Sequence, residues 1–124
     1  MHVRGYQATT ASMVCRVDQN PSTETRAYVA LGSPCVSVYV PVFPAAGIPA
    51  SLSDERTWAR FAAARDRVEA DPNALAEIRA VFSPVEDALW SEADVIEATD
   101  LAAMRAFTAT AFESVEAALT RLSL

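Results

Sequence analysis

Residues 35–43 constrain the fold most strongly, because every second position in this segment is valine and the positions between are largely apolar as well. In an extended strand, alternate side chains point to opposite faces, so the four valines share one face. The other face holds a single serine among apolar and aromatic side chains. A strand with two apolar faces is normally covered above and below. We therefore expect residues 35–43 to be a strand in the protein interior.

Two further segments have the composition of strands. Residues 10–17 and 27–31 are rich in β-branched and apolar side chains, and residues 18–23 between them are dense in turn formers, which predicts a hairpin. Pro41 has no N–H to give to a ladder, so the strand over 35–43 is expected at an edge or to end near this residue.

The second half is predicted to be helical, since residues 48–124 contain no glycine and carry apolar side chains at helical spacing. Ser53 and Asp54 precede the first apolar stripe. The pair Asp71-Pro72 offers a cap and then a proline at the first helical position. Thr99 or Asp100 is expected to cap the last helix.

One further local signal is a capping box at Ser83-Pro84-Val85-Glu86, in which serine and glutamate satisfy each other's amides and proline takes the first helical position. It predicts that a new helix begins there. The second half would then hold about four helices.

Strands followed by helices, without alternation, are typical of the α+β class with an antiparallel sheet (about residues 9–43). The length fits a single domain or partial domain, with a strand region over 1–50 and a helical region over 51–124. One layer of helices covers one face of such a sheet. We expect the other face to be covered by an upstream segment of the same polypeptide or by a second copy of the chain.

Charge and composition exclude several partners. The helical region carries seven arginines against fourteen acids, and such a surface lacks the clustered cations that nucleic-acid binding requires. Prolines interrupt the longest apolar stretch, so no membrane partner is expected and the predicted location is the cytoplasm. The chain has one histidine and no Cys-x-x-Cys, which gives no reason to expect a metal or other cofactor.

Several side chains that could take part in catalysis or binding are expected to have structural or solvated positions instead. Free cysteine is among the most buried residue types, so Cys15 and Cys35 are expected to be structural. The lone histidine, His2, is expected to be solvated. Trp58 shares an apolar stripe and is expected to pack in the core. Three acidic clusters, 54–55, 86–87 and 92–94, are interpreted as solvated helix surface.

The block Gly32-Ser33-Pro34-Cys35-Val36-Ser37-Val38-Tyr39-Val40-Pro41-Val42-Phe43, the Thr/Ser-rich start at 9–12 and the helical stretch over 54–90 together resemble the C-terminal portion of secernins and related cysteine dipeptidases. These are N-terminal-nucleophile hydrolases. The resemblance covers nearly the whole chain but only about the last third of such a protein. Its Gly-Ser-Pro and Ser-Val-Tyr block is the more distinctive part.

The resemblance implies the C-terminal part of a four-layered αββα fold and a hydrolase acting on small peptides or amides. The nucleophile of that class is a cysteine that processing exposes as the first residue, with its own α-amino group as base. This sequence begins Met1-His2-Val3, so we expect no catalytic residue in it and no activity alone. Thr9, Thr10 and Ser12 would line the substrate pocket of a complete enzyme, or be ordinary strand residues. The alternative function is a non-catalytic interaction domain that covers its open sheet face by forming homo-oligomers.

Overall fold

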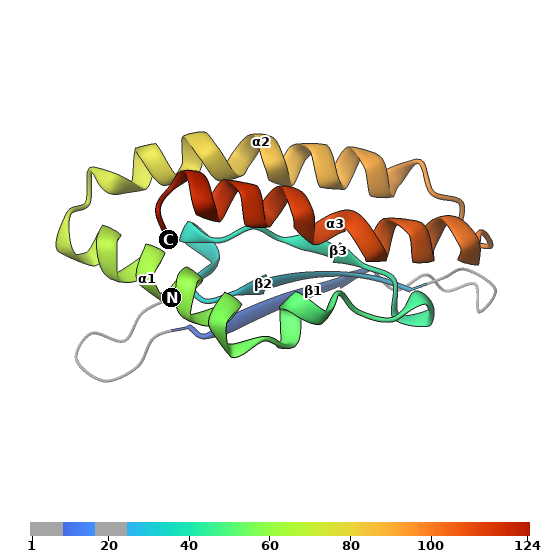
Figure 1. Ribbon diagram of the computed structural model, residues 1–124. Helices are drawn as coiled ribbons and strands as arrows, with labels where there is room; N and C mark the ends of the chain where they lie inside the picture. The colour runs from blue at the N-terminus through green and yellow to red at the C-terminus, as the bar shows by residue number, and fades with distance from the viewer. Residues whose placement is uncertain (1–8, 17–24) are drawn as a thin grey trace.

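A computed structural model describes residues 9–16 and 25–124 and has the α+β class expected from the sequence (Figure 1). Three antiparallel strands come first and three helices follow. The elements are β1 (Ala11–Arg16), β2 (Arg26–Leu31), β3 (Val40–Val42), α1 (Glu55–Ala70), α2 (Ala74–Asp94) and α3 (Leu101–Arg121), with 3₁₀ turns η1 (Pro34–Val36), η2 (Pro44–Ala46) and η3 (Ala50–Ser53). No helix in this described part is long and apolar enough to cross a membrane.

The sheet has the order β1-β2-β3, with Ala11 opposite Leu31 and Ala27 opposite Val42. Pro41 lies in β3, an edge strand of this sheet, which is the position that its missing N–H requires. The predicted extent of this strand is wrong. Only Val40–Val42 pairs with β2, whereas the sequence pattern predicted a strand from residue 35.

The segment before β3 leaves the strand because its backbone bonds elsewhere. Pro34 starts a 3₁₀ turn that closes with the Val36 N–H donating to the Ser33 carbonyl at 3.0 Å. Val36 and Val38 are nevertheless buried, at 3% and 1% exposure. Their apolar pattern therefore indicated burial correctly without specifying an extended conformation.

Side-chain caps fix the starts of two helices. The Asp54 carboxylate accepts from the Arg56 N–H at 3.1 Å, and the Asp100 carboxylate accepts from the Ala103 N–H at 2.9 Å, so Asp100 is the cap of α3. The start of α2 differs from the prediction. Asn73 is at the N-cap position, and Asp71 forms a preceding turn by accepting from the Asn73 N–H at 3.0 Å.

The predicted helix start at Ser83 is wrong. Helix α2 runs unbroken from Ala74 to Asp94 with Pro84 inside it, so the structure has three helices. The physical reason is packing: Ile78 and Phe82 before the proline and Leu89 after it lie on one buried stripe, and burial of that stripe outweighs the cost of an interior proline.

Two of the helices, α2 and α3, gather on the β3 side of the sheet. Helices α2 and α3 pack against each other and both contact β3, as Figure 1 shows, while α1 contacts α2 and η1. The core between them contains four closely packed aromatic rings. Phe43 meets Phe107 edge-on with centroids 5.7 Å apart, and Phe61 lies 5.8 Å from Phe82.

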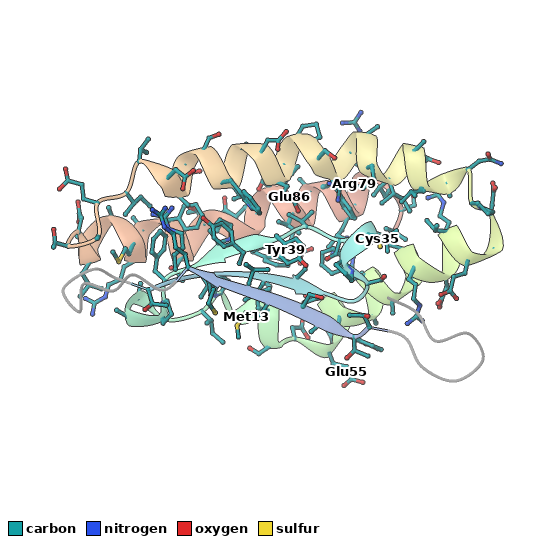
Figure 2. All side chains as sticks on the ribbon, turned by 180° about the vertical axis from the view of Figure 1, so that it is seen from behind. Met13, Cys35, Tyr39, Glu55, Arg79 and Glu86 are labelled. Carbon is teal, nitrogen blue, oxygen red and sulfur yellow. The ribbon has the colours of Figure 1, made fainter. Side chains whose placement is uncertain are left out.

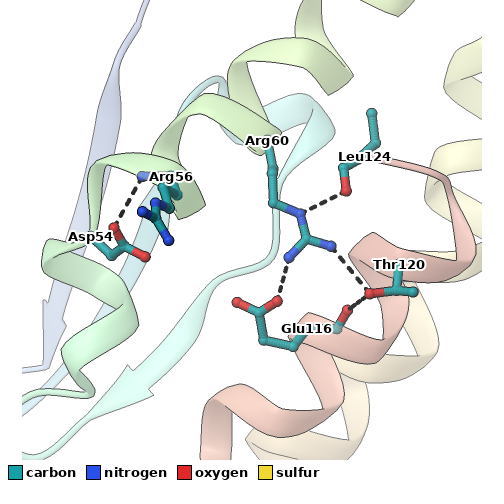
Figure 3. Close-up of polar contacts among 6 residues, drawn as sticks. All are labelled: Asp54, Arg56, Arg60, Glu116, Thr120 and Leu124. Carbon is teal, nitrogen blue, oxygen red and sulfur yellow. Dashed lines mark hydrogen bonds and ion pairs between the residues drawn. The ribbon is translucent and has the colours of Figure 1, made fainter.

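Arg60 of α1 ties the end of the chain to the helical layer (Figure 3). Its Nε donates to the Leu124 carbonyl at 2.7 Å, and its guanidinium also contacts the Glu116 carboxylate and the Thr120 hydroxyl. Because these partners all lie at the end of α3 or beyond it, Arg60 holds α3 against α1. The last turns of α3 and Leu124 are thus anchored to α1.

Candidate functional site

Strand β1 is the second edge of the sheet, and it is uncovered. In the part of the chain that the structure describes, β1 pairs only with β2. Figure 2, the view from behind, shows β1 with no helix in front of it. The neighbouring strand β2 is half-buried or buried throughout, and all of β3 is buried. Exposure therefore increases from β3 to β1.

The hydrogen-bond pattern identifies which backbone groups of β1 point outward. The Gly32 N–H donates to the Thr10 carbonyl at 2.7 Å, so this pair is of the hydrogen-bonded kind. Such pairs alternate along an antiparallel ladder, which directs Ser12, Val14 and Arg16 toward β2. Within β1, the N–H and C=O groups of Ala11, Met13 and Cys15 therefore point away from the sheet.

Each face of β1 carries one large exposed apolar side chain. Met13 is 66% exposed on one face and Val14 is 57% exposed on the other. Arg16, at the end of the strand, is its one charged residue. Natural edge strands are usually protected from pairing by charges, prolines, bulges or a covering segment. The described part of β1 shows none of these apart from Arg16.

The opposite edge of the sheet is blocked by α2. The Tyr39 N–H, next to β3, donates to the Glu86 carboxylate at 2.7 Å, and the Tyr39 carbonyl accepts from Trp90 Nε1 at 2.8 Å. About two turns before Glu86 in α2, Arg79 donates to the Ser37 carbonyl at 2.9 Å. Pro41 has no N–H that needs a partner. The backbone groups of Ser37 and Tyr39 beside β3 are thus occupied by side chains of α2, and Pro41 offers no N–H, so this edge is closed to an added strand.

The predicted environment of Glu86 is wrong. It was interpreted as solvated surface and as half of a capping box, but its side chain is only 18% exposed and binds the Tyr39 amide and Arg79 (Figure 2). Sequence reasoning also missed Trp90 and Arg79 as partners of this edge. A signal was present: residues 79 and 86 are seven apart and residues 86 and 90 are four apart, so all three lie on one side of a helix.

Both cysteines are exposed, which contradicts their expected burial. Cys15 is exposed because nothing in the described residues covers β1, and Cys35 because it lies at an outer position of η1. Trp58 is half-buried against the core, as expected, and also donates to the Thr10 carbonyl at 3.0 Å. His2 lies outside the described residues.

Thr9, Thr10 and Ser12 lie at the start of β1 and remain only predicted substrate ligands. Thr10 is exposed and the other two are half-buried. A hollow of about 240 Å³ is lined by Val14, Tyr28, Tyr39 and Trp90, with the Tyr28 and Trp90 rings 4.6 Å apart. A second hollow, of about 400 Å³, lies between η3 and α3. Neither is lined by the three predicted ligands.

Residues 9–16 and 25–124 were searched for a possible metal site. They contain no group of three or more His, Cys, Asp and Glu residues placed to hold a metal ion. We compared the chain with protein-family models, with curated proteins and with solved structures. Nothing matched. The resemblance to secernins therefore stays a prediction, and function has to be argued from the open edge of β1.

Proposed function

We propose that this chain is a protein-association unit whose open edge, the outer side of β1, is completed by a further β-strand. The difference between the two edges of the sheet supports this proposal. The edge at β3 is closed by Glu86 and Trp90, whereas β1 offers its outward backbone groups between two faces that each carry an exposed apolar side chain, Met13 or Val14. An added strand gains main-chain hydrogen bonds at such an edge and covers apolar surface as well.

A strand peptide tests this proposal directly. A fluorescein-labelled peptide with the sequence of residues 9–16 and serine in place of its cysteine is expected to bind the 124-residue protein. Met13→Pro removes an outward N–H without touching the bonds to β2, so it should weaken binding by at least about tenfold, the equivalent of roughly one hydrogen bond. The measurement is fluorescence anisotropy.

Met13→Ala is the matched control, because it removes the same side chain and keeps the N–H. It should bind the peptide much more tightly than Met13→Pro does, and far-UV circular dichroism should show both variants folded. Equal binding by both variants, or an unaltered protein that is monomeric and does not bind the peptide, would contradict pairing at β1.

The same open edge favours a second candidate, a secernin-like dipeptidase or amide hydrolase completed by an upstream segment of a longer polypeptide. That segment would supply both the missing strands and the nucleophile. Thr9, Thr10 and Ser12 would then contact a small peptide substrate. Neither cysteine of this chain is proposed as the nucleophile, since its one histidine is His2, far from both cysteines in the sequence, and the class uses a cysteine exposed as the first residue.

This second candidate predicts that the 124-residue protein does not hydrolyse dipeptides. A panel of dipeptides assayed by amine release is the measurement. Turnover that disappears in Cys15→Ala or Cys35→Ala would show that this chain carries its own nucleophile, and would contradict the incomplete-enzyme proposal.

A further inference from the structure

We propose that the strand completing β1 is β1 of a second copy of this chain, paired antiparallel with the two Met13 residues opposite each other. This inference rests on the proposed pairing function and names its partner. It is carried by the position of the outward backbone groups, by the charges along β1 and by the blocked edge at β3.

The backbone fixes the register. The outward groups belong to Ala11, Met13 and Cys15, which are symmetric about Met13. A two-fold axis at Met13 places Ala11 opposite the partner's Cys15, so every outward N–H and C=O within β1 meets a partner. A shift of one residue would oppose outward groups to inward ones. A shift of two would leave one end of the strand unpaired.

The charges along β1 permit this pairing. In the proposed register Arg16 lies opposite the partner's Thr10, so the two Arg16 side chains are kept at opposite ends of the interface. Helix α2 carries five of the acids of the chain and lies at the other edge of the sheet. The like-charged surfaces of two copies are therefore held apart, although the chain has a net charge of −6.

The faces of β1 are complementary to themselves. Side chains of directly opposed residues share a face, so Met13 packs beside the partner's Met13 on one face. On the other face Val14 lies beside the partner's Ser12. Both exposed apolar side chains of β1 gain a neighbour, and the two three-stranded sheets become one sheet of six strands.

The blocked edge makes the assembly finite. Each copy has one edge that can pair, because Glu86, Trp90 and Arg79 occupy the other. A two-fold contact through that single edge uses it up in both copies, and the outer edges of the six-stranded sheet are then the two edges covered by α2. The expected product is a closed dimer instead of a growing fibre.

Engineered cysteines test both the partner and the register. In a background of Cys15→Ser and Cys35→Ser, Met13→Cys should form a disulfide-linked dimer under mild oxidation, because opposed residues lie about 5.5 Å apart at Cα. Val14→Cys is the matched control, being similarly exposed. In this register it lies diagonal to its own copy, at about 7–8 Å, and should cross-link several-fold more slowly. A non-reducing gel and the solution mass by light scattering are the measurements.

The outcomes separate this inference from the proposed function. A dimeric mass with cross-linking at Met13→Cys supports both. A monomer that binds the 9–16 peptide overturns the second copy and leaves strand pairing in place. Faster cross-linking at Val14→Cys overturns the register. A dimer that persists in Met13→Pro and does not bind the peptide overturns this inference and the pairing function together.

Discussion

Replacing Glu86 by alanine should lower the free energy of unfolding by about 2 kcal/mol, the scale of a lost hydrogen bond to a charged acceptor. Glu86 receives the Tyr39 N–H at 2.7 Å and lies 3.5 Å from the Arg79 guanidinium, and its side chain is 18% exposed. Alanine would leave the half-buried Tyr39 N–H without this acceptor. Urea unfolding followed by circular dichroism measures the loss, and hydrogen exchange at the Tyr39 amide should become faster.

Two variants separate the roles of the Glu86 carboxylate. Glu86→Gln keeps an oxygen that can accept from Tyr39 but loses the charge facing Arg79, so its effect should lie between those of alanine and the unaltered protein. Glu92→Ala, on the exposed side of the same helix, should change stability by less than about 0.5 kcal/mol. If Glu86→Ala were no more harmful than Glu92→Ala, α2 would not be closing the β3 edge as described.

The sequence predicted those features of the fold that depend on near neighbours. The pairing of β1 with β2 and the start of the last helix at Thr99 or Asp100 follow from residues within a few positions of each other, and the structure has both, with Asp100 as the cap. The apolar pattern over 35–43 indicated burial, but burial does not distinguish a strand from the 3₁₀ turn that Pro34 begins.

The candidate site depended on contacts that are distant in the sequence. Glu86 and Tyr39 are 47 positions apart, and nothing local indicates that a carboxylate will face a backbone amide instead of water. The predicted position of the exposed surface also differs from the observed one. The sequence suggested one uncovered face of the sheet, whereas the exposed side chains lie on both faces of β1, because α2 and α3 gather on the β3 side.

The break predicted at Pro84 shows how a strong local signal can mislead. Ser83, Pro84 and Glu86 match a capping box, but Phe82 and Leu89 are seven residues apart and so remain in helical phase across the proline. That phase was visible in the sequence and indicated one continuous helix. In the structure Glu86 bonds to Tyr39, on another element, so the capping box does not form.

Pro84→Ala should therefore stabilise the protein by about 2 kcal/mol. An interior proline destabilises a helix by about 3 kcal/mol through its missing N–H and its clash with the preceding turn, and the substitution removes this cost. Alanine also gives the unfolded chain more conformational freedom, which lowers the net stabilisation by up to about 1 kcal/mol. The free energy of unfolding in urea and the melting temperature are the measurements. The new amide at position 84 should also be protected from hydrogen exchange, because it can donate to the Ala80 carbonyl.

The control is the same substitution at Pro72, which lies in the turn before α2 begins. Proline suits that turn, so Pro72→Ala should leave stability unchanged or lower it by up to about 1 kcal/mol. The two alanine variants are thus expected to differ in sign. If Pro84→Ala instead behaved like Pro72→Ala, Pro84 would be acting as the first residue of a new helix, and the stripe from Phe82 to Leu89 would not be holding α2 together.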